Sequence, residues 1–175
     1  RDRNLYTLSR HLTQLGASVN RAAIARDTTD QIREAIGFLM SPPPELLICT
    51  GGLGPTQDDL TLEAFAHTFD LPLVKSDQAR DLVEEHYARL LAKGYLHHAG
   101  PEAARKKMAK LPKGATPLPN PIGTAPAVLM EQGGVLIYIL PGVPAEMEAI
   151  FAESILPELR QRFELGSWAQ AALRV

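Results

Sequence analysis

Apolar and polar positions follow two different periods along the chain, and the two periods alternate. Residues 46–50 form a short, continuous apolar run of the kind that predicts a buried strand. Residues 62–69 have helical spacing, as do the leucines of residues 4–15 and the apolar positions of residues 32–39. Because strands and helices alternate over short distances, the pattern predicts βαβ units and a parallel sheet.

Two further patterns complete the expected fold. Residues 17–25 predict a short strand, to which Val19 and Ile24 contribute. Residues 127–131 and 135–140 flank a glycine turn and predict a β-hairpin. The sequence therefore predicts an α/β fold of three layers, in which helices flank a mostly parallel sheet with an antiparallel hairpin at one end. Within this sheet we expect the strand that precedes the first glycine-rich loop to have a neighbour on each side.

That glycine-rich loop leads from the predicted strand into a helix. It contains, in order, Thr50, Gly51, Gly52, Leu53, Gly54, Pro55, Thr56, Gln57, Asp58 and Asp59. In open α/β sheets, ligands bind at the carboxyl ends of the strands. Glycines let the backbone approach a ligand closely, and the N-terminus of the following helix favours an anion. The loop therefore predicts a bound phosphate group.

The adjacent carboxylates of Asp58 and Asp59 would repel a bare phosphate. A divalent cation such as Mg²⁺ would reverse that repulsion, because hard cations take oxygen ligands. We therefore expect a divalent metal held by Asp58 and Asp59, which would also be the catalytic residues. The alternative is a tight turn in which one Asp caps the helix, although a cap accounts for only one carboxylate of the pair.

Two later stretches share the glycine and proline content of this loop. The first contains Asn120, Pro121, Ile122, Gly123, Thr124, Ala125 and Pro126, and the second contains Leu140, Pro141, Gly142, Val143, Pro144, Ala145, Glu146 and Met147. The three motifs, in this order, resemble the N-terminal domain of CinA (competence/damage-inducible) proteins, within the molybdopterin-binding superfamily of molybdenum cofactor biosynthesis. All three loops are expected to meet at one edge of the sheet.

The resemblance implies two kinds of activity. The wider superfamily binds molybdopterin and its adenylated form, whereas the CinA-like branch hydrolyses ADP-ribose-type pyrophosphates with a divalent metal. Our hypothesis is a metal-dependent nucleotide-sugar pyrophosphatase that releases AMP and a sugar phosphate. The alternatives are a molybdopterin- or nucleotide-binding domain without hydrolysis, and a regulatory domain that retains the fold without turnover.

The predicted substrate-binding residues come from all three loops. They are Thr50, Gly51, Gly52, Gly54, Thr56, Asn120, Gly123, Thr124, Pro141, Gly142 and Glu146. Several have a simpler explanation. Glu146 in a first helical turn complements the helix dipole, and the hydroxyl of Thr56 or of Thr124 can cap a helix. Ala127 replaces a glycine of the resembled family, which would strain the second loop if that position needs a positive φ.

Two other groups of side chains bear on the site. His86 falls on the apolar stripe of a predicted long helix and is expected to be a packed core residue. Arg105, Lys106, Lys107 and Lys110 form a charged helix face, from which one cation is able to reach a phosphate. The family's first strand has no counterpart before residue 4, so residues 1–165 are expected to be the domain without that strand, and residues 166–175 the start of a linker.

The composition is that of an ordinary globular domain. The chain has 175 residues, with 18 Lys and Arg against 20 Asp and Glu, and this balance gives no support for a nucleic-acid-binding surface. No apolar run approaches the length of a membrane span, so a cytoplasmic location is expected. The single cysteine, Cys49, has no partner for an internal disulfide. The expected ligand is a small nucleotide or pterin, and a homo-oligomer is expected.

Overall fold

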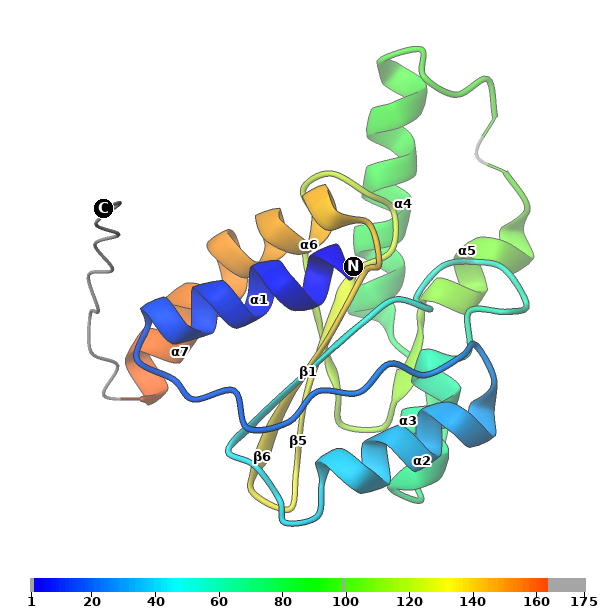
Figure 1. The fold of residues 1–175 in the computed structure, drawn as a ribbon. Helices are drawn as coiled ribbons and strands as arrows, with labels where there is room; N and C mark the ends of the chain where they lie inside the picture. The colour runs from blue at the N-terminus through cyan, green and yellow to red at the C-terminus, as the bar shows by residue number, and fades with distance from the viewer. Residues whose placement is uncertain (1, 99, 164–175) are drawn as a thin grey trace, which may run out of the picture.

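The chain folds into three layers, with helices on both faces of a four-stranded sheet (Figure 1). The computed structural model describes residues 2–98 and 100–163. The helices are α1 (Arg3–Gln14), α2 (Thr29–Leu39), α3 (Thr61–Thr68), α4 (Asp77–Ala92), α5 (Glu102–Met108), α6 (Pro144–Ile150), a π-helical turn η1 (Phe151–Ile155) and α7 (Leu156–Arg162). The strands are β1 (Leu46–Thr50), β2 (Leu73–Lys75), β3 (Lys110–Pro112), β4 (Thr116–Leu118), β5 (Ala127–Gln132) and β6 (Val135–Leu140).

The main sheet is mixed, with the strand order β1-β6-β5-β4. β1 and β6 are parallel, whereas β6 pairs with β5, and β5 with β4, in the antiparallel sense. The predicted α/β class, the three layers and the hairpin are therefore confirmed. The sheet is mixed rather than mostly parallel among the described strands, because β1–β6 is their one parallel pairing.

Strand β6 is the centre of the core, because both of its faces are buried along its whole length. Val135, Ile137 and Ile139 belong to the hydrophobic cluster that includes α2, α3 and α4. The alternate side chains, Leu136, Tyr138 and Leu140, belong to the cluster formed with α1, α6 and α7. The continuous apolar sequence of this strand follows from helices that cover both of its faces.

The predicted strand over residues 17–25 is wrong, and the segment has no regular secondary structure. Val19 and Ile24 are 43% and 77% exposed, so neither side chain contributes the buried contacts that hold a strand in a sheet. β1 consequently pairs only with β6 and lies at the edge of the described sheet, not inside it as expected.

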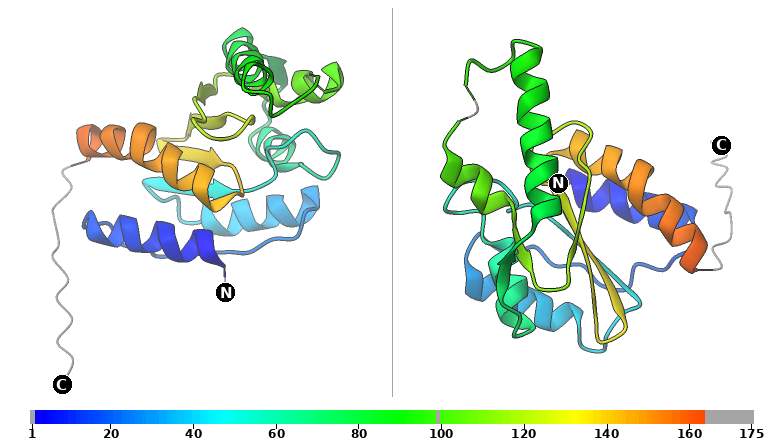
Figure 2. Two further views of the ribbon diagram at one scale, coloured as in Figure 1. Left: turned by 90° about the horizontal axis from the view of Figure 1, so that it is seen from above. Right: turned by 180° about the vertical axis from the view of Figure 1, so that it is seen from behind.

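A projecting arm continues the chain after β2. Helix α4 extends beyond the sheet in Figure 1 and in the rear view of Figure 2, and α5 runs back beside it. β2 and β3, which the sequence did not predict as a pair, form a separate antiparallel ladder that joins the two ends of this arm. The arm therefore returns α5 to the neighbourhood of α3 and the glycine-rich loop.

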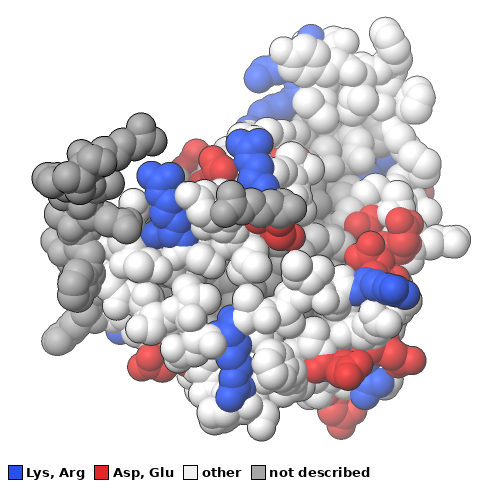
Figure 3. Space-filling view, viewed as in Figure 1, with Lys and Arg blue, Asp and Glu red and all other residues white. Residues whose placement is uncertain are grey.

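The charged surface is of mixed sign. On the face shown in Figure 3, Lys and Arg side chains are interspersed with Asp and Glu. A surface of this kind creates no extended field of one sign. Within residues 2–98 and 100–163, no helix is long and apolar enough to cross a membrane. The linker predicted over residues 166–175 lies outside the described residues.

Candidate functional site

The three predicted loops come together at the carboxyl ends of β1 and β6. Gly51 N–H donates to the carbonyl of Leu140 at 2.8 Å, which extends the parallel ladder into the first and third loops. A Cβ atom added to Gly142 would stand 3.2 Å from the Cα of Gly51. A Cβ atom added to Gly123 would overlap the carboxylate of Glu146, so the second and third loops also touch.

Asn120 organises the second loop with four hydrogen bonds. Its Oδ1 accepts from the N–H groups of Ile122 (3.1 Å) and Gly123 (2.8 Å). Its Nδ2 donates to the carbonyl of Ala125 at 2.9 Å and to Glu146 Oε2 at 2.7 Å. The Asn120 side chain is 7% exposed and has no unused hydrogen-bonding atom. It therefore fixes both the shape of its own loop and the direction of the Glu146 carboxylate.

Asn4 joins the site from α1 and was not predicted as a site residue. Asn4 Nδ2 donates to the carbonyl of Gly142 at 2.8 Å, across 138 residues of sequence. The other amide atom, Oδ1, is buried without a hydrogen-bond partner among the described residues. The sequence signal for this residue was only its place in the first turn of α1.

The glycine-rich loop is held in shape by Asp59. Asp59 Oδ2 accepts from the N–H of Thr56 at 2.8 Å and from its hydroxyl at 2.5 Å. The Asp59 carboxylate lies directly over Gly54, where a Cβ would be 2.6 Å from Oδ2. Burial raises the pKa of Asp59, but the hydrogen bonds from Thr56 and Gly54 and the charge of Lys107 outweigh burial, so the pKa lies below its usual value. The lowered pKa favours the ionised carboxylate of Asp59, which holds the loop through its hydrogen bonds with Thr56.

Asp58, which directly precedes Asp59 in the chain, has different surroundings. It is exposed, and no described residue forms a hydrogen bond or ion pair with its side chain. Within the described ranges, no group of three or more His, Cys, Asp or Glu side chains is placed to hold a metal ion. A Mg²⁺ ion shared with ligand phosphates would need only one or two protein carboxylates, because phosphate and water oxygens would complete its shell. Asp58 is the available carboxylate for that purpose.

Lys107, a member of the predicted charged face, reaches the loop. Its Nζ donates to the carbonyl of Asp59 at 2.9 Å and also to the carbonyl of Thr56. By contrast, Lys106 forms an exposed ion pair with Glu102, as expected for a solvated helix face. The sequence indicated that one cation of this face could approach the site, but only the path of the arm selects Lys107.

The remaining predicted residues occupy the same three loops. Thr50 ends β1 opposite Leu140, Pro141 is buried just beyond β6, and Thr124 is half-buried in the second loop. Ala127 is fully buried and does not have a positive φ, so alanine causes no backbone strain there. The structure thus places the predicted residues together, whereas their roles in binding and catalysis stay predictions.

His86 lies behind this site on α4 and is 6% exposed, which agrees with the predicted packed residue. Its Nδ1 is buried without a hydrogen-bond partner among the described residues. Burial, together with the charges of Arg89 and Lys93, lowers the pKa of His86, while Glu146 and Glu85 partly oppose this shift. The imidazole is therefore harder to protonate in the fold than in the unfolded chain.

We expect His86 to make the protein less stable in mild acid. Its pKa is lowered on folding, so below about pH 6.5, the usual value for histidine, the unfolded chain binds a proton that the folded chain does not. Stability is then lost as the pH falls from about 7.5 toward the folded pKa. Urea unfolding of the wild type and of His86→Gln at pH 7.5 and 5.5 measures this contribution. The wild type should lose more stability than the variant.

The control for this experiment is His67→Gln, because His67 is exposed on α3. This variant should follow the wild type at both pH values. An equal acid-induced loss of stability in the wild type and in His86→Gln would show that His86 does not take part.

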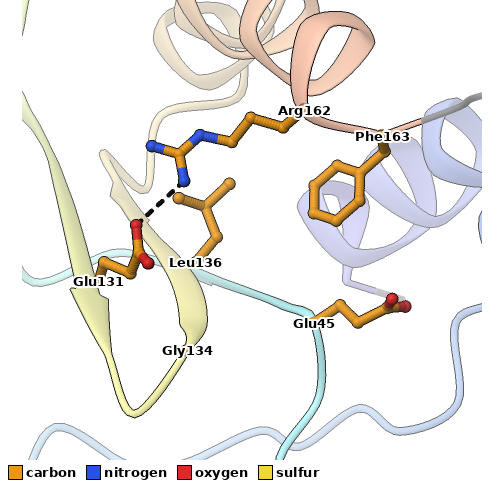
Figure 4. Close-up of a pocket in the computed structure, with 6 residues that line it drawn as sticks. All are labelled: Glu45, Glu131, Gly134, Leu136, Arg162 and Phe163. Carbon is orange, nitrogen blue, oxygen red and sulfur yellow. Dashed lines mark hydrogen bonds and ion pairs between the residues drawn. The ribbon is translucent and has the colours of Figure 1, made fainter.

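A cavity of about 470 Å³ lies at the opposite end of the sheet (Figure 4). It is lined by Glu45, Glu131, Gly134, Leu136, Arg162 and Phe163, and none of these is a predicted site residue. Its one lining cation among the described residues is paired, since Arg162 contacts Glu131 at 3.0 Å and Glu158 at 3.1 Å. Glu158 also accepts from the hydroxyl of Tyr138 at 2.8 Å. This network ties α7 to the sheet and leaves Arg162 already paired.

Comparisons with solved structures agree with the architecture. The crystal structure of CinA from Thermoplasma acidophilum, a protein of unknown function, is similar with a TM-score of 0.76 and 33% identity, over 92% of this chain and 86% of that one. The molybdopterin biosynthesis enzyme MoaB from Thermus thermophilus has a TM-score of 0.55 over 92% of this chain and 82% of its own. At 22% identity, the second likeness shows the fold alone.

Comparisons of sequence identify the family. A protein of Pyrobaculum aerophilum is 45% identical over 159 residues, which cover 91% of this chain and 57% of that protein. A protein of Thermococcus kodakarensis is 37% identical over 161 residues, covering 92% of this chain and 64% of the relative. The chain thus spans only about three-fifths of the length of these relatives. The model of the probable molybdopterin binding domain matches residues 1–161, and the chain therefore belongs to this family, MoCF_biosynth.

Proposed function

We propose that the three loops bind a small phosphorylated ligand of the pterin or nucleotide type. The observation that carries this proposal is the close approach of Gly51 and Gly142 at the carboxyl ends of two parallel strands, which is where ligands bind in open α/β sheets and where glycine lets the backbone approach a ligand closely. The carboxylate of Glu146, held by Asn120, is a fixed acceptor for a hydroxyl or ring N–H of that ligand. The family description, a probable molybdopterin binding domain, supports the same class of ligand.

A second candidate function is metal-dependent hydrolysis of an ADP-ribose-type pyrophosphate. It is favoured by the exposed, unpaired carboxylate of Asp58 beside the loop that would hold the phosphates. A bound divalent cation would neutralise the pyrophosphate oxygens and activate a water molecule. The chain's own residues would bind and orient the ligand, with Asp59 and Lys107 fixing the loop and Glu146 fixing the ligand. Cleavage of the phosphoanhydride with one water gives AMP and a sugar phosphate.

Binding and hydrolysis are separated by one pair of measurements. Isothermal titration calorimetry with AMP and ADP-ribose tests the binding proposal, and AMP release from ADP-ribose with Mg²⁺, Mn²⁺ or Co²⁺ tests hydrolysis. Binding without AMP release supports the binding domain. If neither nucleotide binds, molybdopterin is the remaining ligand of the proposed class, and failure to bind it as well would refute the proposal.

Asp58→Asn and Asp59→Asn test the two carboxylates of the loop. We expect each variant to lose most metal-dependent hydrolysis, by a factor on the order of 10² to 10³, as for other preorganised electrostatic groups. Their melting temperatures should differ, because Asp59 accepts two hydrogen bonds within the loop whereas Asp58 accepts none from the described residues. Asp58→Asn should therefore melt like the wild type, and Asp59→Asn somewhat lower. Unchanged AMP release at saturating metal in both variants would refute the hydrolytic role.

A further inference from the structure

The Glu146 carboxylate is fixed between the second and third loops, and one of its two oxygens has no partner. Its Oε2 accepts from Asn120 Nδ2 at 2.7 Å, and a Cβ atom added to Gly123 would overlap both carboxylate oxygens. Its Oε1 has no hydrogen-bond partner among the described residues, and the fold does not enclose this atom. Glu146 therefore presents Oε1, and the second lone pair of Oε2, in a fixed direction at the proposed ligand site.

Two exposed apolar residues belong to the same two loops. Ile122 directly precedes Gly123 and is 51% exposed, and Val143, the cap of α6 one helical turn before Glu146, is 53% exposed. The backbone of Ile122 is fixed, because its N–H donates to Asn120 at 3.1 Å. Ligand sites combine apolar side chains with a few fixed polar groups. This combination suits a flat heterocyclic ring, with its edge on the carboxylate, better than it suits a sugar or a phosphate group.

A carboxylate distinguishes ring edges, because it accepts hydrogen bonds and donates none. The 2-amino-4-oxopyrimidine edge, which guanine and pterins share, offers a ring N–H and an amino group side by side, so both carboxylate oxygens meet a donor. Adenine offers its amino group beside a ring nitrogen that carries a lone pair, so one carboxylate oxygen would face another acceptor. An acceptor that loses water without gaining a donor costs free energy. A fixed carboxylate therefore favours the guanine and pterin edge over the adenine edge.

We propose that Glu146 is a specificity-determining residue that accepts two N–H bonds from a 2-amino-4-oxo ring edge, and so selects guanine-type rings over adenine. This proposal rests on the proposed function, since it places the ring of the ligand on the second and third loops. Asn120 takes part in the selection, because its amide holds Glu146 Oε2 and keeps the carboxylate from turning away. The proposal also favours the binding function over hydrolysis of ADP-ribose, whose ring is adenine.

The test compares GMP, IMP and AMP by isothermal titration calorimetry, because these nucleotides share a ribose 5-phosphate and differ in the ring edge. We expect GMP to bind at least about tenfold more tightly than AMP, as in other two-bond contacts between a side chain and a base. IMP keeps the ring N–H but lacks the 2-amino group, so its affinity should lie between the two. Ribose 5-phosphate, which has no ring, should bind more weakly than GMP.

Glu146→Gln should lower the GMP-to-AMP affinity ratio by at least about tenfold. A glutamine amide has one accepting and one donating side, which matches the adenine edge and not the guanine edge. The variant should melt within about 2 °C of the wild type, because the amide oxygen is still able to accept from Asn120. Glu148→Gln is the matched control, since Glu148 is exposed on α6 and its replacement removes the same charge. This control should leave the ratio unchanged.

The outcomes separate this proposal from the proposed function. Equal binding of GMP and AMP by the wild type would refute the selection by Glu146 and leave the three-loop site intact. If Glu146→Gln tightens the binding of all four ligands equally, ribose 5-phosphate included, the carboxylate acts by its charge alone and the proposal is wrong. Absence of binding by all four ligands also refutes it, because GMP carries the proposed edge, and leaves the proposed function to its own test with molybdopterin.

Discussion

Replacing Asn120 by alanine should lower the melting temperature by about 6–12 °C. Asn120 is buried and makes four hydrogen bonds, to Ile122, Gly123, Ala125 and Glu146. Its removal leaves buried backbone groups without partners, at a cost of about 3 kcal/mol in the free energy of unfolding. In a domain of this size, each kcal/mol shifts the melting temperature by about 2–4 °C. Differential scanning calorimetry measures the shift.

Asn20→Ala is the matched control, because Asn20 is exposed in the irregular segment before α2. This variant should melt within about 2 °C of the wild type, as exposed substitutions usually do. Asn120→Ala should also weaken AMP binding, since the Glu146 carboxylate loses the amide that orients it. A melting temperature for Asn120→Ala equal to that of the control would mean that water satisfies the loop and that Asn120 is not its organiser.

Gly52→Ala should destabilise the protein by about 3 kcal/mol or more and deform the glycine-rich loop. Gly52 has a φ of +67°, where an L-residue costs roughly 1–2 kcal/mol. Its Cβ would also overlap the hydroxyl of Thr61, which is only 5% exposed and begins α3. Since the N–H of Thr61 donates to the carbonyl of Gly52 at 3.3 Å, the loop and the helix cannot separate freely. Urea unfolding gives the change in the free energy of unfolding.

Two further variants divide this effect into its parts. Gly114→Ala tests backbone strain alone, because Gly114 has a φ of +87° and a Cβ added there would meet no described atom within 4 Å beyond its chain neighbours. The double variant Gly52→Ala with Thr61→Ala removes the hydroxyl that the new methyl would meet. We expect it to be more stable than the sum of the two single variants predicts, which is the sign of a direct contact. Strict additivity would contradict the steric explanation.

The sequence alone determined the parts of this protein that depend on local signals. Residues 46–50 and the hairpin over residues 127–140 were recognised because apolar runs bounded by glycine and proline leave few alternatives. The meeting of the three loops also followed from the sequence, because the carboxyl ends of neighbouring parallel strands lie at one edge of a sheet. Val19 and Ile24 were too weak a signal for a strand over residues 17–25, because two apolar residues five positions apart do not share one face of a strand, and that strand is absent from the described residues.

Only the tertiary structure decided which side chains complete the site. Asn4 contacts Gly142 across 138 residues, and Lys107 contacts Thr56 across 51. Such contacts leave no periodic trace in the sequence, because they depend on where the helices and the arm return to the sheet. Asp58 and Asp59 are a second example, because the sequence gives no reason to treat them differently. In the structure, the Asp59 carboxylate accepts a hydrogen bond from Thr56, whereas Asp58 is exposed. The backbone path, which local patterns do not encode, makes that distinction.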